Sequence, residues 1–401
     1  MTNVPALLQA IKNREEPVVI VGAGVVGGVL LSICNDAGIT VDFFCDSSDK
    51  VAANGTFCGL RVLHISQIPS GYNDAIFIIS AASIKDVVER LSDQGNSNWY
   101  AGGLLLKNID VSQSDANLDY AKFAIENCIL CHDGYLHPER IFMRSVDIII
   151  TERCSLKCKD CSNLMQYYEH PRDCNVDVLL DSIDALCAVI DEVMDFRVIG
   201  GEVFISKNWP VIVRRLIDEP KAKRVVLYTN GTILPAQRHL DLLKHEKVLV
   251  IASDYGALSK NLSRMKSLFR EHGIAHHVLT VTEWLSCSAI ARHDRGFDGN
   301  RELFKLCCAK NMASLSEGKL FRCPYAANAF RLGAVPDHSD DYVDLLRWPF
   351  DEGELKCTLR DYLLQKPFMN ICDYCNGRPL SGVEVEPYVQ TDAPLAYHRC
   401  T

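Results

Sequence analysis

Three cysteines, Cys154, Cys158 and Cys161, stand close together in the run Thr151-Glu-Arg-Cys-Ser-Leu-Lys-Cys-Lys-Asp-Cys. This segment can gather its three thiols only as a tight loop, so it constrains the fold around it. Thiolates are the usual protein ligands of iron–sulfur clusters. Three of them can hold three irons of a four-iron cluster, which leaves the fourth iron open to a small molecule. The spacing therefore predicts a 4Fe–4S site with one open iron.

A zinc site of three cysteines and one histidine is the alternative for the same loop. Such sites usually come as two CxxC-like pairs on separate loops. The nearest downstream histidine, His170, lies nine residues after Cys161. No histidine is therefore close enough in the sequence to complete the site, and we favour the cluster.

Two strand ends follow the cysteine loop in the sequence. One apolar run ends in Gly200, Gly201 and Glu202, and a second ends in Thr229 and Asn230. Parallel strands present their carboxyl ends at one edge of a sheet, where loops carry active groups. We therefore expect both strand ends to lie near the cysteines.

The cysteine loop and the two strand ends together resemble radical S-adenosylmethionine (SAM) enzymes. In that family the open iron binds the amino and carboxylate groups of SAM, and an electron from the cluster releases a 5′-deoxyadenosyl radical. The resemblance implies that the Gly-Gly-Glu end holds the SAM ammonium and that the Thr-Asn end faces its ribose. It fails at Asp160, because the residue before the third cysteine is usually aromatic and packs near the adenine.

The bulk composition indicates a cytoplasmic, oxygen-sensitive protein of two or three domains. Its 401 residues are 48% hydrophobic and 23% charged, as in ordinary globular proteins. A net charge of −9 argues against nucleic acid or an anionic membrane as a partner, and no apolar run approaches a membrane span. With 18 cysteines and no basic, apolar leader, we expect thiols that bind metal rather than disulfides.

Residues 1–105 are predicted to form a Rossmann-like parallel sheet domain. A buried strand at 17–21 precedes Gly22, Gly24 and Gly27, a helix follows, and a second strand ends at Asp46. The glycine turn and the helix N-terminus can approach an anionic group, while the acid can meet a ribose hydroxyl. The same glycines also permit close packing of strand and helix without any ligand.

The pattern from Asp46 to Ser80 resembles the N-terminal Rossmann-like domain of bacillosamine-type sugar acyltransferases. Those domains bind part of a nucleotide-linked sugar, so the resemblance implies binding of a nucleotide or nucleotide sugar. Residues 106–144 are expected to be a connector, in which Cys128 and Cys131 pack rather than bind metal.

Residues 145–295 alternate between strand and helix signals, which fits the partial (β/α)6 barrel of radical SAM enzymes. Helical stretches cover 176–195 and 260–272, and Asp254, Tyr255 and His277 are candidates to face a substrate. The apolar runs expected to form strands are 146–150, 196–199, 224–228, 247–252 and 276–281.

Residues 296–401 are expected to form a small α+β domain with a second cysteine set. Its predicted ligands are Cys308, Cys323, Cys372 and Cys375. Cys307 is equally placed by spacing. Four thiolates can bind a 4Fe–4S cluster completely, and the pattern resembles the twitch auxiliary-cluster domain, a shortened relative of the SPASM domain. A zinc ribbon is the alternative, although its pairs are normally two CxxC knuckles.

These features predict a radical SAM oxidoreductase that acts on a sugar, nucleotide-linked or phosphorylated. A fully ligated auxiliary cluster cannot chelate substrate, so its simplest use is to accept an electron, which favours dehydrogenation of an alcohol. The twitch resemblance points the same way, because one such enzyme oxidises a carbohydrate-like alcohol. It also implies an external electron donor such as flavodoxin or ferredoxin. Tyr325 and Asn328, just beyond Cys323, are further substrate-facing candidates.

Two other enzyme classes remain open. Many auxiliary-cluster radical SAM proteins modify ribosomal peptides, but they often carry a winged-helix domain where this chain has a Rossmann-like unit. A radical SAM sugar epimerase would need a hydrogen donor such as Cys287, although a buried structural role fits that cysteine as well. A non-catalytic nucleotide sensor would not need the two strand ends.

Overall fold

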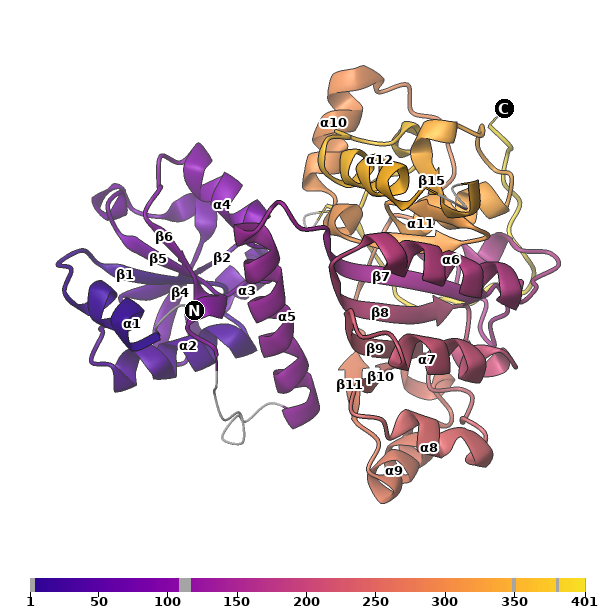
Figure 1. The fold of residues 1–401 in the computed structure, drawn as a ribbon, viewed down its shortest axis with the longest axis horizontal. Coiled ribbons are helices and arrows are strands. Elements are labelled where there is room, and N and C mark those ends of the chain that lie inside the picture. Colours follow the sequence, from indigo (N-terminus) through magenta and orange to yellow (C-terminus); the bar gives the residue numbers. More distant parts are fainter. Residues whose placement is uncertain (1–3, 108–116, 348–350, 380–381, 401) are drawn as a thin grey trace. The chain divides into compact units, whose positions relative to one another are not determined.

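The computed structural model describes residues 4–107, 117–347, 351–379 and 382–400, and it divides into two compact units, Met1–Arg140 and Ile141–Thr401. Each unit has its own sheet and its own hydrophobic core (Figure 1). The expected connector differs from this division. Its described part forms helix α5 (Leu118–Leu136), which packs on α2 (Val25–Asp36) within the first unit, while residues 108–116 lie outside the described ranges.

The first unit is a six-stranded sheet in the order β3-β4-β2-β1-β5-β6, parallel throughout except for the β3–β4 pair. Its strands are β1 (Val18–Val21), β2 (Phe43–Asp46), β3 (Thr56–Phe57), β4 (Leu60–His64), β5 (Ile76–Ile79) and β6 (Trp99–Ala101). The remaining helices are α1 (Val4–Lys12), α3 (Asp49–Ala53) and α4 (Ile84–Asp93). This open parallel sheet matches the expected Rossmann-like arrangement.

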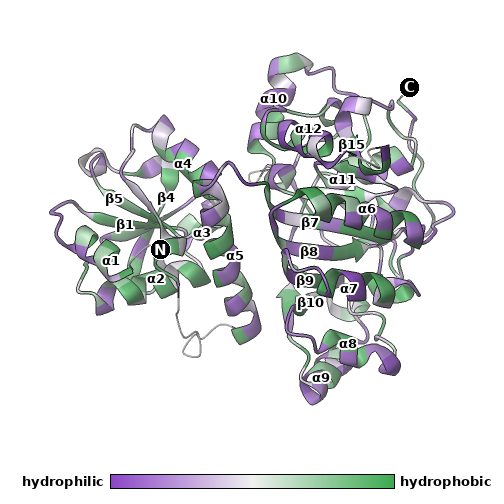
Figure 2. Ribbon diagram, in the orientation of Figure 1, coloured by the Kyte–Doolittle hydropathy of each residue, from purple (hydrophilic) through white to green (hydrophobic). Residues whose placement is uncertain are grey.

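Both faces of this sheet are buried, which explains the continuous apolar strands. Val18 and Ile20 of β1 pack in a core with α2 and α5, while Val19 and Val21 pack on the opposite face with α4. A strand covered on both faces needs apolar residues at every position rather than at alternate ones. Figure 2 accordingly shows β1 and β5 as hydrophobic along their lengths.

The second unit is built on an eight-stranded mixed sheet, in the order β11-β10-β9-β8-β7-β13-β14-β15 (Figure 1). Its strands are β7 (Phe142–Thr151), β8 (Glu192–Gly200), β9 (Ala222–Thr229), β10 (Val248–Asp254), β11 (His276–Thr280), β13 (Ala313–Ser316), β14 (Lys319–Phe321) and β15 (Tyr342–Asp344). Its helices are α6 (Val176–Val189), α7 (Trp209–Ile217), α8 (Leu240–Leu243), α9 (Leu262–His272), α10 (Gly296–Leu306), α11 (Pro324–Arg331) and α12 (Glu352–Leu364).

The first five strands of this sheet run parallel and in chain order, as the alternating pattern predicts. The sequence analysis located no sixth strand for the expected barrel, and none follows β11 directly in the described chain. After β11 the chain forms β12 (Trp284–Leu285), which pairs with β16 (Glu384–Val385) in a separate small sheet. The sixth parallel strand is β13, which pairs with β7 at the opposite edge from β11. Hydroxyl and charged residues interrupt the sequence after β11, so no buried strand follows there.

Side chains of the central strands alternate between two environments. Val146 and Ile148 of β7 and Val198 of β8 pack in the main core, under α6 and α7. Asp147 and Arg197 lie on the other face of the same strands, because successive strand residues point to opposite sides. Figure 2 shows hydrophilic colour on β8 despite its central place in the sheet. The face away from the helices is therefore available for polar chemistry.

The helix expected at 176–195 is shorter than the sequence indicates. It begins after Asn175, whose side chain accepts the backbone N–H of Val178, and it ends at Val189. Residues 192–195 already belong to β8, and no glycine or proline marks the change from helix to strand. In the described part of the chain, no helix combines the length and apolar character needed to cross a membrane.

Candidate active site

The three cysteines of the loop after β7 line one cavity of about 550 Å³. That volume lies within the range of small-molecule sites, which is roughly 300–1,000 Å³. The carboxyl ends of β8, β9 and β10 line the same cavity, through Gly200, Gly201, Thr229, Asn230, Ser253 and Tyr255. The structure thus brings together the cysteine loop and the strand ends that the sequence predicts to meet.

Two glycines allow the cysteine loop to lie against the end of β8. A Cβ added at Gly200 would stand 2.2 Å from the carbonyl oxygen of Thr151. A Cβ added at Gly201 would stand 2.3 Å from the carbonyl oxygen of Arg153 and 2.8 Å from Cβ of Cys154. Both contacts are too close for any other residue, so the two glycines place Cys154 at the strand end.

Glu202 does not line the cavity, in contrast to the expected contact between its carboxylate and the SAM ammonium. The side chain is fully buried, and it accepts hydrogen bonds from Thr229 Oγ1 and from the backbone N–H of Asn230, each at 2.8 Å. Burial raises the pKa of this carboxyl to about 7. In this arrangement Glu202 holds the second strand end in place.

The C-terminal segment lies directly against the cysteine loop. The N–H of Lys159 donates to the carbonyl of Val389 at 2.7 Å, and the N–H of Thr391 donates to the carbonyl of Lys157 at 2.8 Å. Between them, Gln390 Nε2 donates to Sγ of Cys158 at 3.1 Å. Residues 230 or more positions apart in the sequence therefore share this site, which no local spacing could reveal.

An aromatic cluster stands beside the cavity. Tyr255 and Trp284, which both line it, have ring centroids 5.8 Å apart. Tyr388 of the C-terminal segment stacks on Tyr255 at 5.4 Å. Burial raises the pKa of Tyr255, and the three cysteines contribute to the same shift. The predicted substrate-facing Tyr255 is thus held in the cavity by packing.

Charged groups face the cavity from the centre of the sheet. Arg197 Nε donates to Asp147 Oδ1 at 2.6 Å, and Ser314 Oγ donates to Asp147 Oδ2 at 3.3 Å. The guanidinium of Arg197 lies 5.7 Å from the ring centroid of Tyr228. Arg378, from the C-terminal part of the unit, lines the same cavity. The lining therefore offers cations and hydrogen-bond donors to a polar ligand.

The second cysteine set lines a different and much smaller cavity, of about 20 Å³. The cysteines there are Cys307, Cys323, Cys372 and Cys375, and most of their neighbours are apolar, among them Leu303, Phe304, Met369 and Ile371. Burial raises the pKa of the Cys372 and Cys375 thiols to about 12. A metal ion opposes such a shift, since coordination deprotonates a thiol.

Cys308, the ligand predicted from the sequence, does not line this small cavity, whereas Cys307, its equally spaced alternative, does. Cys307 ends α10 in an extended conformation, which directs consecutive side chains to opposite sides. The N–H of Cys308 donates to the carbonyl of Arg378 at 2.9 Å, and its side chain lines the large cavity. Sequence spacing could not separate these neighbours, because the two cavities lie on either side of the chain.

The seven thiols fit two iron–sulfur clusters by their grouping, three around an open cavity and four around a closed one. Within the described ranges, no three His, Cys, Asp or Glu side chains are arranged to hold a single metal ion. A four-iron cluster spreads its thiolates over separate irons, so it does not require that arrangement. The loop cysteines would hold the SAM-binding cluster and the second set would hold the auxiliary one.

Several predicted substrate contacts lie elsewhere. Asp254 and His277 are absent from the lining of the large cavity, and Asp254 Oδ1 instead accepts the N–H of Gly256. Tyr325 lines the small cavity, where its hydroxyl donates to the carbonyls of Ala289 and Tyr374. Asn328 is fully buried and accepts a hydrogen bond from Tyr168. A position near a strand or helix end does not show whether a side chain lines the cavity or packs in the protein interior.

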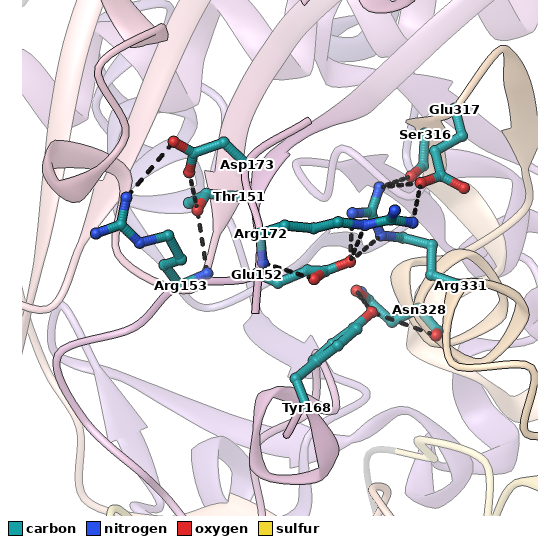
Figure 3. A network of polar contacts seen from close by, with 10 residues as sticks. All are labelled: Thr151, Glu152, Arg153, Tyr168, Arg172, Asp173, Ser316, Glu317, Asn328 and Arg331. Carbon is teal, nitrogen blue, oxygen red and sulfur yellow. Dashed lines mark hydrogen bonds and ion pairs between the residues drawn. The ribbon is translucent and has the colours of Figure 1, made fainter. Parts of the chain in front are cut away.

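A buried ion-pair network connects the two cysteine sites. Figure 3 shows Arg331 of α11 reaching Glu152, two residues before Cys154. Arg331 Nε donates to Glu152 Oε1 at 2.9 Å, and the two side chains are 1% and 3% exposed. Arg172 donates its backbone N–H to the same carboxylate. The start of the cysteine loop is thereby fixed to the helix that follows Cys323.

The first unit carries the predicted glycine turn between β1 and α2. A Cβ at Gly27 would stand 2.1 Å from the carbonyl oxygen of Gly22, whereas a Cβ at Gly24 would meet nothing within 4 Å. Gly22 has φ +109°, a region that favours glycine. The carboxylate of Asp46 accepts the N–H groups of Ala23 and Ser48, each at 2.9 Å. Gly22 and Gly27 thus serve close packing, and Asp46 orders the turn.

The polar residues of the cavity are the main site feature that the sequence analysis missed. Arg197, Tyr228 and Arg378 received no role, and Gln390 was not singled out. Arg197 interrupts the apolar run of β8, and Tyr228 interrupts that of β9. Because successive strand residues point to opposite faces, such a polar position indicates that one face of the sheet meets a polar ligand. Arg378 and Gln390 have no such signal, because only the folded chain brings them to the site.

Comparisons with known proteins agree with this reading of the site. The model of the Radical SAM superfamily matches residues 148–263. No curated protein sequence matches the chain.

Similar solved structures include BtrN in complex with AdoMet and 2-DOIA, with 16% identity and a TM-score of 0.36, over 63% of this chain and 98% of that one. Native anSMEcpe with bound AdoMet and a Cp18Cys peptide has 20% identity and a TM-score of 0.28, over 35% and 43%. SuiB of Streptococcus suis bound to S-adenosylmethionine has 14% identity and a TM-score of 0.28, over 49% and 44%. The chain thus spans less than half the length of anSMEcpe and of SuiB.

The matched segment contains Cys154, Cys158 and Cys161 together with both strand ends that line the large cavity. The same segment carries three of the five consecutive parallel strands of the second unit, β8, β9 and β10, and the carboxyl end of a fourth, β7. The part of the chain that matches the Radical SAM superfamily model is therefore the part that carries the three-cysteine site.

Proposed function

We propose that the protein is a radical SAM oxidoreductase that dehydrogenates an alcohol of a sugar, nucleotide-linked or phosphorylated, with an auxiliary cluster as electron acceptor. The observation that carries this proposal is the presence of two cysteine sites of different character in one unit. One has three cysteines and opens on a cavity of about 550 Å³, and the other has four cysteines around about 20 Å³. The first leaves room for ligands, and the second is suited to electron transfer alone.

Bound SAM and its cluster would supply hydrogen-atom abstraction at the cysteine side of the large cavity. The chain's own residues prepare the remainder of the site. Asn230 and Ser155 are joined at 3.2 Å beside Cys154, and Glu202 fixes Asn230 from below. The Tyr255–Trp284 pair restricts the cavity to a shape that a ring-shaped substrate can fill by stacking.

An oxidation also needs a base to take the hydroxyl proton. Asp147 is the buried carboxylate of the cavity, but its ion pair with Arg197 engages it. We assign the Asp147–Arg197 pair a role in orienting the substrate. The guanidinium of Arg197 and the neighbouring phenol of Tyr228 can both donate hydrogen bonds to sugar hydroxyls. Proton removal is left to water or to Asp147 after rearrangement of the pair.

For the first unit, taken by itself, we propose binding of a nucleotide or a nucleotide-linked sugar. This part of the proposal rests on the β1–α2 turn, where Gly24 leaves open space at the start of a twelve-residue helix. Backbone N–H groups at a helix start favour an anionic group. Flavodoxin or ferredoxin would supply the reducing electron.

The test uses anaerobically reconstituted protein with SAM, a strong reductant and separate panels of nucleotide sugars, sugar phosphates and peptide fractions. 5′-Deoxyadenosine is quantified by chromatography, and the second product by mass. We expect 5′-deoxyadenosine to rise with a sugar, whose product is lighter by two hydrogens. A rise with peptides alone would contradict the proposal and favour a peptide maturase.

One observation favours epimerisation as a second candidate. Cys308 lines the large cavity as an exposed thiol, whereas Cys287, the donor expected for an epimerase, is 4% exposed and lines neither cavity. A substrate carbon radical that takes the thiol hydrogen forms a new C–H bond. The sulfur radical then needs one electron from the external donor and one proton from solvent to restore the thiol. Turnover in D2O would place one deuterium on an epimerised product, and Cys308→Ala would abolish that product; an oxidised product without deuterium would exclude this route.

A further inference from the structure

Arg378 stands out among the charged groups of the large cavity because it has no carboxylate partner. Its Nε is buried and has no hydrogen-bond partner, and no ion pair of its guanidinium occurs among the described residues. Arg197, the other arginine of the cavity, is neutralised by Asp147 at 2.5 Å. The remaining carboxylate of the lining, Glu283, is exposed. A guanidinium whose Nε is buried without a hydrogen-bond partner is unfavourable unless an anion meets it.

The backbone holds Arg378 at the cavity wall. Its carbonyl accepts the N–H of Cys308 at 2.9 Å, and its neighbour Pro379 bridges to Cys307. Cys308, Met312 and Pro324 line the same cavity as Arg378. The arginine therefore reaches the cavity from the same segment that supplies the auxiliary cysteines, and its position depends on that segment rather than on a flexible surface loop.

We propose that Arg378 forms an oxyanion subsite of the large cavity, which binds a phosphate or carboxylate group of the substrate. The guanidinium presents paired N–H donors that match either group in a bidentate contact. Asp147 keeps Arg197 occupied, so Arg378 supplies the uncompensated charge. The inference rests on the proposed function, since it concerns the substrate of that cavity. It narrows the substrate to an anionic sugar whose charged group lies at Arg378.

Two other anions compete for the same role. The carboxylate of SAM could pair with Arg378, and so could the sulfurs of the clusters, because Cys287, Cys308, Cys307 and Cys323 all contribute to its electrostatic surroundings. The substrate is favoured because the buried donor without a partner belongs to a residue that lines the ligand cavity. These alternatives predict different losses in an Arg378 variant, and the experiment separates them.

The test measures protection of Cys308 from alkylation in the reconstituted holoprotein, with SAM present throughout. Cys308 lines the same cavity, and peptide mapping by mass spectrometry reads its modification separately from the other cysteines. The probes are inorganic phosphate, glucose 1-phosphate and glucuronate, with glucose as the neutral control. We expect saturable protection by glucose 1-phosphate or glucuronate and none by glucose.

Arg378→Gln should weaken that protection by at least about tenfold, since a hydrogen-bonded contact to a charged group is lost. Arg378→Lys keeps the charge without the bidentate geometry and should show an intermediate effect. Arg264→Gln, on the exposed side of α9, is the matched control and should change nothing. Iron content and SAM binding are measured for each variant.

Protection that persists in Arg378→Gln, or no protection of the wild-type protein by any anionic probe, would overturn the proposal. Loss of SAM binding with unchanged protection would assign the arginine to SAM, and loss of iron with unchanged protection would assign it to the clusters. Protection without any sugar turnover would contradict the proposed reaction but keep the subsite. If Arg378→Gln does not fold, the wild-type and Arg378→Lys titrations decide the question.

Discussion

The two cysteine sites of the second unit use the same ligand type in opposite surroundings. The site after β7 has three cysteines, charged neighbours such as Arg197 and a cavity of about 550 Å³. The site after α10 has four cysteines, mostly apolar neighbours and about 20 Å³ of space. A thiolate set that is incomplete and roomy can share its metal with a ligand, whereas one that is complete and enclosed can exchange only electrons. The number of cysteines and the size of the cavity therefore indicate the same roles: ligand binding at the three-cysteine site and electron transfer at the four-cysteine site.

The largest expected effect distinguishes the adjacent cysteines of the closed site. Cys307→Ala should lose about half of the bound iron, because it removes one of four ligands of one of two clusters. Cys308→Ala should retain all of it, since that side chain lines the other cavity. Iron and sulfide analysis after anaerobic reconstitution measures both variants. The reverse result, with iron lost only in Cys308→Ala, would restore the ligand set expected from spacing.

The connection between the sites is tested by removing the buried partner of Glu152. Arg331→Met should lower the free energy of unfolding by about 3–5 kcal/mol, because the buried carboxylate of Glu152 loses its buried cation and keeps only the exposed guanidinium of Arg172, 3.8 Å away. A urea titration under anaerobic conditions measures the change.

The double variant Glu152→Gln/Arg331→Met is the control for this effect. It should recover part of the loss, since no unpaired charge remains. Equal stability of the single variant and the wild type would mean that the network of Figure 3 does not fix the two sites to each other.

The hydrogen bond from Gln390 to Cys158 allows the reduction potentials of the two cysteine sites to be compared. An N–H donor to a cluster sulfur stabilises the reduced state, so Gln390→Met, which removes the donor without adding a charge, should lower the reduction potential of the three-cysteine site. A net hydrogen bond of about 1 kcal/mol corresponds to about 40 mV for a one-electron couple. A redox titration followed by EPR checks this, and the potential of the four-cysteine site should stay constant. A shift of both potentials would mean that the effect is not local.

The smallest effect concerns the charged face of the sheet. Burial raises the pKa of Asp195 to about 6, although Ser145 Oγ donates to it at 2.6 Å. The folded state therefore holds this proton more tightly than the unfolded state. Stability should fall as the pH rises from the unfolded pKa, near 4, through 6, and level off above. Asp195→Asn removes the contribution of this carboxyl to the pH dependence of stability.

Between pH 5 and 7.5, Asp195→Asn should thus gain on the order of 1 kcal/mol relative to the wild type. Urea titrations of both proteins at the two pH values measure that difference. A constant difference would show that Asp195 stays ionised in the fold, and that this face is more polar than its burial indicates.

Much of the fold could be predicted because its signals are local. Apolar runs alternate with helical stretches through the first five strands of the second unit, and each strand lies where its run predicts, within a few residues. The failures have tertiary causes. The sixth parallel strand lies at the opposite edge of the sheet, and helix α6 ends before Asp195 because the strand that follows is selected by pairing with β7.

The candidate site divides in the same way. The spacing of Cys154, Cys158 and Cys161 predicts their site from the sequence. In the structure their loop and the strand ends expected from sheet geometry line the same cavity. The choice between Cys307 and Cys308 depends on which side of the chain each faces. Arg378 and Gln390 are brought to the site only by the fold, so no motif indicates them. Asp254 and His277 occupied plausible positions but lie outside the cavity lining.

The central claim is that the two cysteine sets hold separate clusters, of which one binds SAM. The most direct measurement is the EPR spectrum of reduced, fully reconstituted protein with and without SAM, for the wild type and for the triple variant of Cys154, Cys158 and Cys161 to alanine. For the wild type we expect two EPR signals, one of which changes with SAM. For the triple variant we expect about half the iron and one signal that is insensitive to SAM. A SAM-sensitive signal that survives in the variant would contradict the account.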